Sequence, residues 1–157
     1  MSRPGDGFSA GVLLYRRADD ALSVLLVHPG GPYWRNRWAG AWQIPKGQAM
    51  PGETALAAAR REFEEELGAP PVGEAIPLGR LRQRGGKLVE AFAIQGEFDV
   101  ATLTSIAFEL EWPPKSGKLR AFPEVDTARW FTLDEARTEI LPSQQPFLDR
   151  LAEVLGD

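Results

Sequence analysis

The chain opens with two apolar runs whose pattern predicts strands. They cover residues 8–16 and 22–28, and Ala18-Asp19-Asp20 turns the chain between them, so a β-hairpin is expected. The second run is apolar almost throughout, which is typical of a strand that is buried on both faces. After a long loop, residues 42–46 predict a short extended segment, because the residue before Pro45 avoids the helical region.

Four further strands are predicted, at residues 76–84, 87–95, 105–112 and 128–131. The first two flank Gly85-Gly86, which is a two-residue hairpin signal. The second strand of that hairpin has apolar residues on both faces except for Glu90, and this pattern predicts a central position in a sheet.

Apolar residues at helical spacing predict three helices, at residues 55–67, 133–140 and 145–155. Glu53 or Thr54 is expected to cap the first helix, and Gly68 to end it in a left-handed conformation. Thr132 is expected to cap the second helix, with Glu135 completing a capping box. Strands mixed with a few helices, without the strict alternation of a doubly wound fold, predict a layered α/β domain.

The first helix carries more negative charge than its own stability favours. Glu62, Glu65 and Glu66 project from neighbouring positions and crowd its C-terminal turn. Like-charged neighbours cost about 0.2–0.5 kcal/mol per pair, and the helix dipole favours cations at this end. Two interpretations remain open. The residues form a solvated acidic face balanced by Arg60 and Arg61, or a divalent cation such as Mg2+ or Mn2+ completes the site.

Composition narrows the class of protein. A chain of 157 residues, 43% apolar and 25% charged, is ordinary for a globular domain. We therefore expect a single domain over residues 1–157, with residues 1–7 flexible. A net charge of −4, from 18 basic and 22 acidic residues, gives no general attraction for nucleic acid. The absence of cysteine and the single histidine, His28, exclude disulfides, thiolate metal sites and multi-histidine metal sites. With no signal-peptide pattern and no membrane-spanning run, a cytoplasmic protein is expected.

Two segments have the composition to contact a substrate. The loop at 28–41 contains Tyr33, Trp34 and Trp38 with two arginines among them, and such groups can stack a nucleobase and attract phosphate. Alternatively, the rings pack the loop onto the domain or form a dimer contact. The second segment is the end of the 76–95 hairpin, where basic residues form either a solvated edge or a phosphate-facing patch. Its basic residues are Arg80, Arg82, Arg84 and Lys87.

Taken together, residues 47–69 resemble a Nudix box. The chain matches the family pattern at Gly47, Glu53, Arg61, Glu62, Phe63, Glu65, Glu66, Gly68 and Ala69. Only Ala69 is a weak match, because a larger aliphatic residue is usual there. The resemblance extends from about residue 8 to the end and implies the Nudix fold, an α/β/α sandwich with a mixed β-sheet. The whole chain also resembles bacterial proteins described as predicted NTP pyrophosphohydrolases.

The resemblance implies a metal site on the first helix. Glu65 and Glu66 would be metal ligands, Glu62 would be a further ligand or the general base, and the carbonyl of Gly47 would also contact the metal. The cofactor would be Mg2+, for which Mn2+ can substitute.

The remaining box residues would support this site. Arg61 would hold the box carboxylates in place, and Glu53 would pair with Arg61 to fix the loop against the helix. Family members differ in which glutamate acts as the base, and Glu111 and Glu124 are the candidates outside the box.

The implied activity is hydrolysis of a nucleoside diphosphate linked to another moiety. The segment 42–47 resembles the one that leads into the box of diadenosine tetraphosphate and diphosphoinositol polyphosphate hydrolases, where Lys46 would contact phosphate. A tyrosine that bacterial dinucleoside polyphosphate hydrolases carry about sixteen residues past the box is missing. The preferred substrate is a dinucleoside polyphosphate or an NTP. The substrate contacts would come from Lys46, Tyr33, Trp34, Arg82 and Lys87.

Other functions remain as alternatives. The domain would then sense a nucleotide without cleaving it, or would act on a diphosphoinositol polyphosphate, an ADP-sugar or capped RNA. We expect a small-molecule nucleotide as the binding partner, no membrane and no extended nucleic-acid surface. Monomer and homodimer both remain open.

Overall fold

The computed structural model describes residues 8–83 and 85–156. The expected flexibility of residues 1–7 and the side chain of Arg84 lie outside the described residues. The strands are β1 (Phe8–Ala18), β2 (Ala21–Pro29), β3 (Lys46–Gln48), β4 (Ala75–Arg82), β5 (Leu88–Gln95), β6 (Ala107–Glu111), β7 (Leu119–Pro123) and β8 (Val125–Thr132). The helices are α1 (Ala55–Leu67), α2 (Leu133–Glu139) and α3 (Gln145–Leu155), with 3-10 turns at Val100–Thr102 and Pro142–Gln144.

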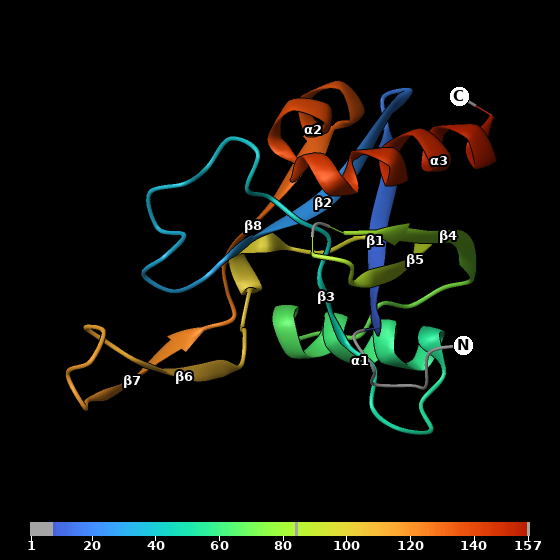
Figure 1. The fold of residues 1–157 in the computed structure, drawn as a ribbon. Coiled ribbons are helices and arrows are strands. Elements are labelled where there is room, and N and C mark those ends of the chain that lie inside the picture. Colours follow the sequence, from blue (N-terminus) through green and yellow to red (C-terminus); the bar gives the residue numbers. More distant parts are fainter. Residues whose placement is uncertain (1–7, 84, 157) are drawn as a thin grey trace.

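One mixed sheet forms the centre of the fold. Its strand order is β4-β5-β1-β2-β8, and β3 pairs with β1 outside that path. The pairing of β1 with β5 is parallel and the other pairings are antiparallel. Helix α1 covers one face, and α2 and α3 cover the other (Figure 1). The predicted α/β/α sandwich with a mixed sheet is therefore confirmed, as is the central position of β5.

Alternate residues of β1 supply the two cores. Leu13 and Tyr15 pack in the cluster that α2 and α3 cover, whereas Val12 and Leu14 pack in the cluster beneath α1. This alternation is the period-two geometry of a strand. Both faces of β1 are buried, so its position is fixed by packing. Strand β3 pairs with β1 and leads the chain towards α1.

The predicted elements differ from the structure mainly at their ends. The helix at 145–155 and the capping box of α2 are as predicted, but α2 ends one residue earlier. The short strand at 128–131 is the middle of the longer β8. The extended segment predicted at 42–46 makes an isolated bridge to β2, and strand pairing with β1 begins only at Lys46.

Strand β7 was not predicted, and it pairs with β6 to form a separate two-stranded sheet. Residues 107–123, which we call the arm, project from the body of the molecule (Figure 1). The strand predicted at 105–112 contains β6, but the pattern of the chain predicts no strand over the residues of β7. Strand β7 is only five residues long and mostly exposed, so it lacks the apolar run that marks a buried strand.

His28 fixes the loop that follows β2. Its ring is fully buried, with Nδ1 at 2.9 Å from Asp126 Oδ1 and Nε2 at 2.5 Å from the carbonyl oxygen of Arg37. Trp38 stacks on the imidazole, with ring centroids 4.0 Å apart. Packing therefore accounts for Trp38. We call residues 30–41 the aromatic loop.

None of the helices in the described part of the chain has the length and apolar character needed to cross a membrane.

Candidate active site

Helix α1 begins and ends at the residues that its sequence indicates. The Thr54 side chain accepts a hydrogen bond from the backbone N–H of Ala57 at 3.1 Å, which makes Thr54 the N-cap. Gly68 ends the helix with a φ of 90° and donates its N–H to the carbonyl of Glu64. A residue with a Cβ is strained in that left-handed conformation. These caps fix the rotation of α1 and hence the direction of its glutamates.

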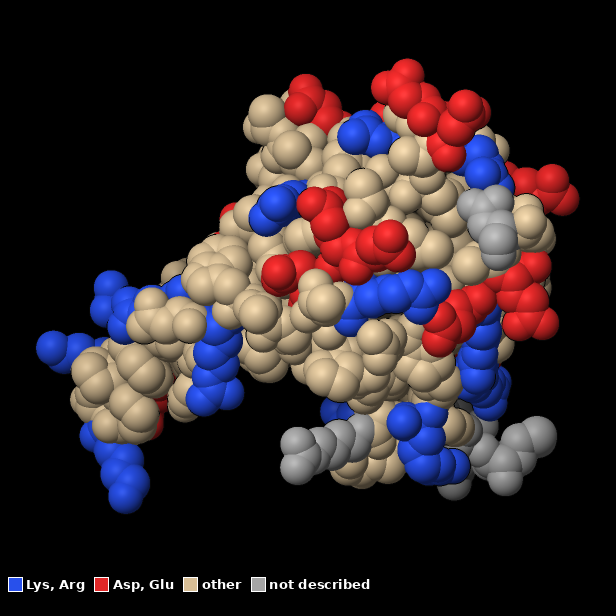
Figure 2. Space-filling view, turned by 90° about the horizontal axis from the view of Figure 1, so that it is seen from above, with Lys and Arg blue, Asp and Glu red and all other residues tan. Residues whose placement is uncertain are grey.

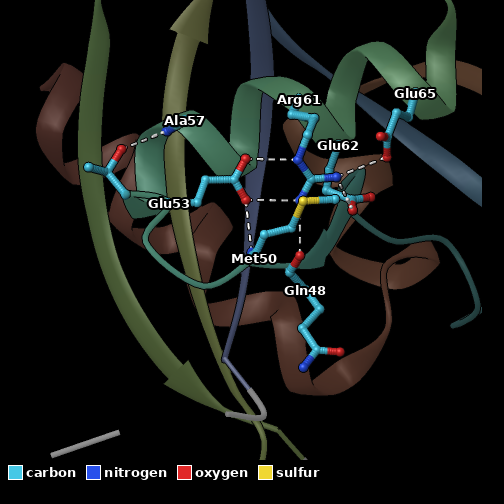
Figure 3. Close-up of polar contacts among 8 residues, drawn as sticks. Gln48, Met50, Glu53, Ala57, Arg61, Glu62 and Glu65 are labelled. Atoms are coloured by element: carbon cyan, nitrogen blue, oxygen red, sulfur yellow. Dashed lines mark hydrogen bonds and ion pairs between the residues drawn. The ribbon is translucent and has the colours of Figure 1, made fainter. Parts of the chain in front are cut away.

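Arg61 is the centre of a polar network at the start of the box (Figure 3). Its guanidinium donates two hydrogen bonds to the Glu53 carboxylate, at 2.8 and 3.0 Å. It also donates to Glu62 at 3.0 Å, to Glu65 at 3.1 Å, and to the carbonyl of Gln48 at 3.0 Å. Two-point pairing with a carboxylate is geometrically specific to arginine. One side chain thus ties the loop before α1 to two glutamates on the helix.

Two carboxyl groups that contact Arg61 have pKa values shifted in opposite directions. Hydrogen bonds from Arg61 hold the pKa of Glu53 below its usual value, and those bonds raise the pKa of Arg61 in turn. Burial, followed by the charge of Glu65, raises the pKa of Glu62. Glu53 is therefore a firmly ionised partner, whereas Glu62 is a carboxylate with an enhanced affinity for protons or cations.

Glu66 is the most strongly perturbed acid among the described residues. It is 5% exposed, and its Oε2 atom is buried without a hydrogen-bond partner. Burial and then the charges of Glu62 and Glu124 raise the pKa of Glu66 to about 9. Buried polar atoms are normally satisfied, so a buried carboxylate oxygen that no protein group satisfies, beside a pocket, fits a site that binds a ligand.

Glu66 faces a pocket of about 170 Å³. Glu124 lies at the junction of the arm and β8, and Lys46 lies at the start of β3; both line this pocket with Glu66. Burial lowers the pKa of Lys46, and the charge of Glu66 opposes that shift. The pocket therefore combines carboxylates with one cation that can approach phosphate.

A second pocket of about 220 Å³ adjoins the first, and the two share Gln43 and Lys46. Its other polar lining comes from Ser9, Gln83, Lys87 and Ser143. The side chain of Gln83 both donates to the carbonyl of Ser143, at 3.2 Å, and accepts from its hydroxyl, at 2.7 Å. Sequence reasoning missed Gln43, Gln83 and Ser143, because isolated polar residues on three separate segments form no pattern along the chain.

Gly47 lies against the carboxylate of Glu62. A Cβ placed at residue 47 would lie 2.0 Å from Glu62 Cδ and 2.1 and 2.4 Å from its two oxygens. We expect Gly47→Ala to displace Glu62 and to reduce kcat at least about 10²-fold, because displacements near 1 Å have effects of that size. Steady-state kinetics on the folded variant check this prediction.

Gly52→Ala is the matched control for that experiment. Gly52 lies five residues after Gly47, in the turn between β3 and α1, with a φ of 81°, and nothing lies within 4 Å of a Cβ built there. The control should lose about 1 kcal/mol of stability from backbone strain while keeping its kcat. Equal losses of kcat in both variants would contradict the role of the Gly47–Glu62 contact.

The donor chemistry of the site fits a hard divalent cation. Within residues 8–83 and 85–156, no three acidic or histidine side chains converge as they stand on a metal position, and Arg61 holds one oxygen of Glu62 and one of Glu65. Two observations nevertheless match a cation: the Oε2 atom of Glu66 has no protein partner, and burial together with the neighbouring carboxylates raises the pKa of Glu66. A cation among carboxylates reverses such shifts.

The other predicted substrate residues are not all near the pockets. Lys46 and Lys87 line them. Tyr33 is exposed and packs edge-on against Trp112. Arg82 is exposed and donates to the carbonyl of Gly86, so it stabilises its own hairpin. Neither Tyr33, Arg82 nor the predicted contact Trp34 lines either pocket.

The candidate bases outside the box are also separated by the fold. Glu124 lines the pocket that Glu66 faces. Glu111 lies at the far end of β6 in the arm, where its carboxylate accepts the backbone N–H of Lys115 at 2.9 Å. Of these two residues, only Glu124 is placed near the box carboxylates.

Comparison with known proteins identifies the family. A NUDIX domain family model matches residues 6–151. The chain therefore belongs to the Nudix family, and its complete box makes it a hydrolase of that family. Nudix hydrolases generally require a divalent metal ion. A comparison with curated proteins found no match.

Solved structures of low sequence identity share the fold. A Caenorhabditis elegans Ap4A hydrolase, solved as a binary complex, is 21% identical, with a TM-score of 0.67 over 94% of this chain and 98% of that one. The NUDIX domain of Shewanella oneidensis NrtR, complexed with ADP ribose, is 16% identical, with a TM-score of 0.66 over 94% and 87%. A MutT protein from Methanosarcina mazei is 19% identical, with a TM-score of 0.60 over 96% and 95%.

Proposed function

We propose that this protein hydrolyses a phosphoanhydride bond in a nucleoside diphosphate linked to another moiety, with a dinucleoside polyphosphate or an NTP as substrate. The observation that carries the proposal is the buried, unpartnered carboxylate oxygen of Glu66 at a pocket that also contains Lys46. A phosphate chain is an anion, so it enters a carboxylate-lined pocket only with a cation between them.

Glu62, Glu65, Glu66 and the carbonyl of Gly47 are the proposed ligands of Mg2+, for which Mn2+ can substitute. When bound, a divalent cation lowers the pKa of water and neutralises charge on phosphate oxygens. Arg61 then has a positioning role, because it contacts Glu62 and Glu65 through hydrogen bonds of 3.0 and 3.1 Å. Glu53 holds Arg61 in turn.

The remaining chemistry falls to residues that line the pocket. Lys46 is proposed to contact a phosphate oxygen of the substrate, since its ammonium is the cation that the two pockets share. Glu62 or Glu124 is proposed to accept the proton of the attacking water. Burial raises the pKa of Glu62 above its usual value, which makes it a stronger base than a free carboxylate. Glu124 lines the pocket.

Removing divalent cations should abolish activity and should also lower the thermal stability of the protein, which is an independent readout. In excess EDTA we expect no turnover, and addition of Mg2+ should restore it. Because a ligand that binds only the folded state stabilises it by RT ln(1 + [L]/Kd), Mg2+ at about 100 times its Kd should add about 2.7 kcal/mol. Thermal unfolding with and without Mg2+ measures this. Full turnover in EDTA, or no change in Tm, would argue against the metal assignment.

The substrate itself is tested by a panel with products resolved. Diadenosine polyphosphates, the common NTPs and dNTPs, ADP-sugars, diphosphoinositol polyphosphates and capped RNA are incubated with the protein and Mg2+. A nucleoside monophosphate released from a dinucleoside polyphosphate or an NTP supports the proposal. Binding of a nucleotide without turnover of any compound in the panel would favour a nucleotide sensor.

The expected cytoplasmic location is tested separately, by cell fractionation.

A further inference from the structure

The arm begins and ends at the candidate active site. At its base, the backbone N–H of Glu124 donates to the carbonyl of Ile106 at 2.9 Å, and the N–H of Ile106 donates to the carbonyl of Glu65 at 3.0 Å. The arm is thus attached to the turn of α1 that carries the box glutamates. An isolated two-stranded hairpin is marginally stable in water, so the projecting strands need a partner surface.

The aromatic loop supplies part of that surface. Gly30 donates its N–H to the carbonyl of Glu124 at 2.9 Å. A Cβ on Gly31 would lie 3.1 Å from the ring of Phe108, and the rings of Tyr33 and Trp112 meet edge-on with centroids 5.4 Å apart. The arm and the aromatic loop therefore form one continuous surface, which we call the arm surface.

The arm surface is basic on a protein that is acidic overall. Residues 30–41 and 107–123 contain five basic residues, Arg35, Arg37, Lys115, Lys118 and Arg120, and only two acidic ones, Glu109 and Glu111. All five basic side chains are exposed. None of them forms an ion pair within the described part of the chain. Figure 2 shows lysine and arginine on the projecting end, whereas acidic side chains gather on the body.

The pocket at Glu66 is too small for a whole nucleotide substrate. It measures about 170 Å³, whereas small-molecule sites usually measure about 300–1,000 Å³. A substrate must therefore extend beyond it. On one side the pocket continues through Lys46 into the second pocket. On the other side its lining includes Pro29 and Glu124, which lead directly into the aromatic loop and the arm.

We propose that the arm surface binds a second nucleotide at the far end of the substrate. The base stacks on Tyr33 or Trp112, and Lys118 and Arg120 bind its phosphates. This inference rests on the proposed function and narrows it. A substrate with a nucleoside at each end, joined by a chain of phosphates, uses both the second pocket and the arm surface. A dinucleoside polyphosphate is therefore preferred over an NTP.

Charge and aromatic rings together favour this occupant. Exposed aromatic rings stack nucleobases, and arginine and lysine bind phosphate. Five basic residues suit the few phosphates of a small molecule, whereas the net charge of −4 disfavours the long phosphate backbone of RNA.

The test compares a two-ended with a one-ended substrate. Lys118→Gln/Arg120→Gln and, separately, Tyr33→Ala are assayed with diadenosine tetraphosphate and with ATP in Mg2+. Each variant should raise KM for diadenosine tetraphosphate about 10-fold, the size of two exposed phosphate contacts or one base stack. The kcat values, and KM for ATP, should change less than about 3-fold, because the arm surface lies outside the pocket.

Two further variants serve as controls. Glu109→Gln on the same hairpin removes a negative charge and should leave KM for diadenosine tetraphosphate unchanged or lower it. Lys118→Arg/Arg120→Lys keeps the charge and should retain the low KM. Unchanged KM values in Lys118→Gln/Arg120→Gln, or equal increases for both substrates, would overturn the inference. The inference would also be overturned if the Lys118→Gln/Arg120→Gln variant bound a 5′-triphosphorylated RNA more weakly but kept its KM for diadenosine tetraphosphate. If the unmodified protein cleaves neither nucleotide, the proposed function itself fails.

Discussion

Glu66→Gln is expected to lose at least about 10³-fold in kcat and, at the same time, to make the metal-free protein more stable. Loss of metal assistance removes several kcal/mol of transition-state stabilisation, and each 1.36 kcal/mol is a factor of ten. The gain in stability arises because folding forces buried Glu66 to keep a proton that the unfolded chain releases at neutral pH, as its raised pKa of about 9 reflects. Glutamine has nearly the same shape and no ionisable group, so it avoids this cost.

The sign of the pH dependence follows from the raised pKa. Glu66 has a folded pKa of about 9, so the folded protein holds this proton while the unfolded chain releases it near its ordinary value. The free energy of unfolding in EDTA should therefore fall as pH rises from about 4.5 to about 9. At pH 7 the Glu66 contribution to this loss is roughly 3 kcal/mol. Glu66→Gln should remove that slope, as measured by denaturant unfolding across the pH range.

Glu64→Gln is the matched control. Glu64 lies on the same helix two residues earlier, is exposed, and occupies a box position where any residue is allowed. Its removal should leave both kcat and the pH slope unchanged. Mg2+ should raise the Tm of the unmodified protein and of Glu64→Gln, but not that of Glu66→Gln. A Glu66→Gln protein that turns over normally would eliminate Glu66 as a metal ligand.

Arg61→Ala is expected to reduce both stability and activity. Arg61 donates hydrogen bonds to three carboxylates and one backbone carbonyl, and its removal leaves those carboxylates facing one another. The side chain is 24% exposed, so solvent screens part of the loss, and we expect about 2 kcal/mol, or a Tm lower by about 4–8 °C. Activity should fall about 10–100-fold, as for residues that orient metal ligands.

The Arg61→Lys variant and measurements at acid pH distinguish the effect of the positive charge at residue 61 from the effect of its two-point pairing with Glu53. Lysine keeps the charge but cannot pair with Glu53 at two points, so this variant should lie between the other two proteins in stability and activity. The pKa of Glu53 is lowered in the folded state, so its stabilising contribution is present above about pH 4.5 and is lost as pH falls through the folded value. The difference in Tm between Arg61→Ala and the unmodified protein should therefore shrink in acid. A constant difference would show that Glu53 is not the partner that matters.

The box was predictable because its chemistry is local in sequence. The caps Thr54 and Gly68 and the glutamates of α1 occupy consecutive turns of one helix, so spacing alone gives their relative directions. The structure also bears out the implied contact between Glu53 and Arg61, at 2.8 and 3.0 Å. Glu53 and Arg61 are only eight positions apart in sequence, so their contact is still local.

The surroundings of the box were less predictable because they depend on long-range pairing. Gln43 and Ser143 are one hundred residues apart in sequence and share a pocket because their neighbours pair: Trp42 bridges Ile140, and Leu141 donates its N–H to the carbonyl of Trp42 at 2.7 Å. The position of Glu66 in the chain gave no indication that its Oε2 would be orphaned. Long-range packing also places Trp38 on His28, whereas Arg82 donates to the carbonyl of Gly86 in its own hairpin.

The way the arm is joined to the body indicates that the arm can be replaced without disturbing the rest of the fold. Its two ends, at Ile106 and Glu124, are bonded to each other, and Val125 donates its N–H to Ser105 at 3.1 Å. These hydrogen bonds hold the two ends of the arm together at its base. We therefore expect that residues 107–123 can vary in length and sequence without moving α1. Selectivity for the far end of a substrate can diverge there while the catalytic machinery stays fixed, which makes this segment the natural place to redesign substrate preference.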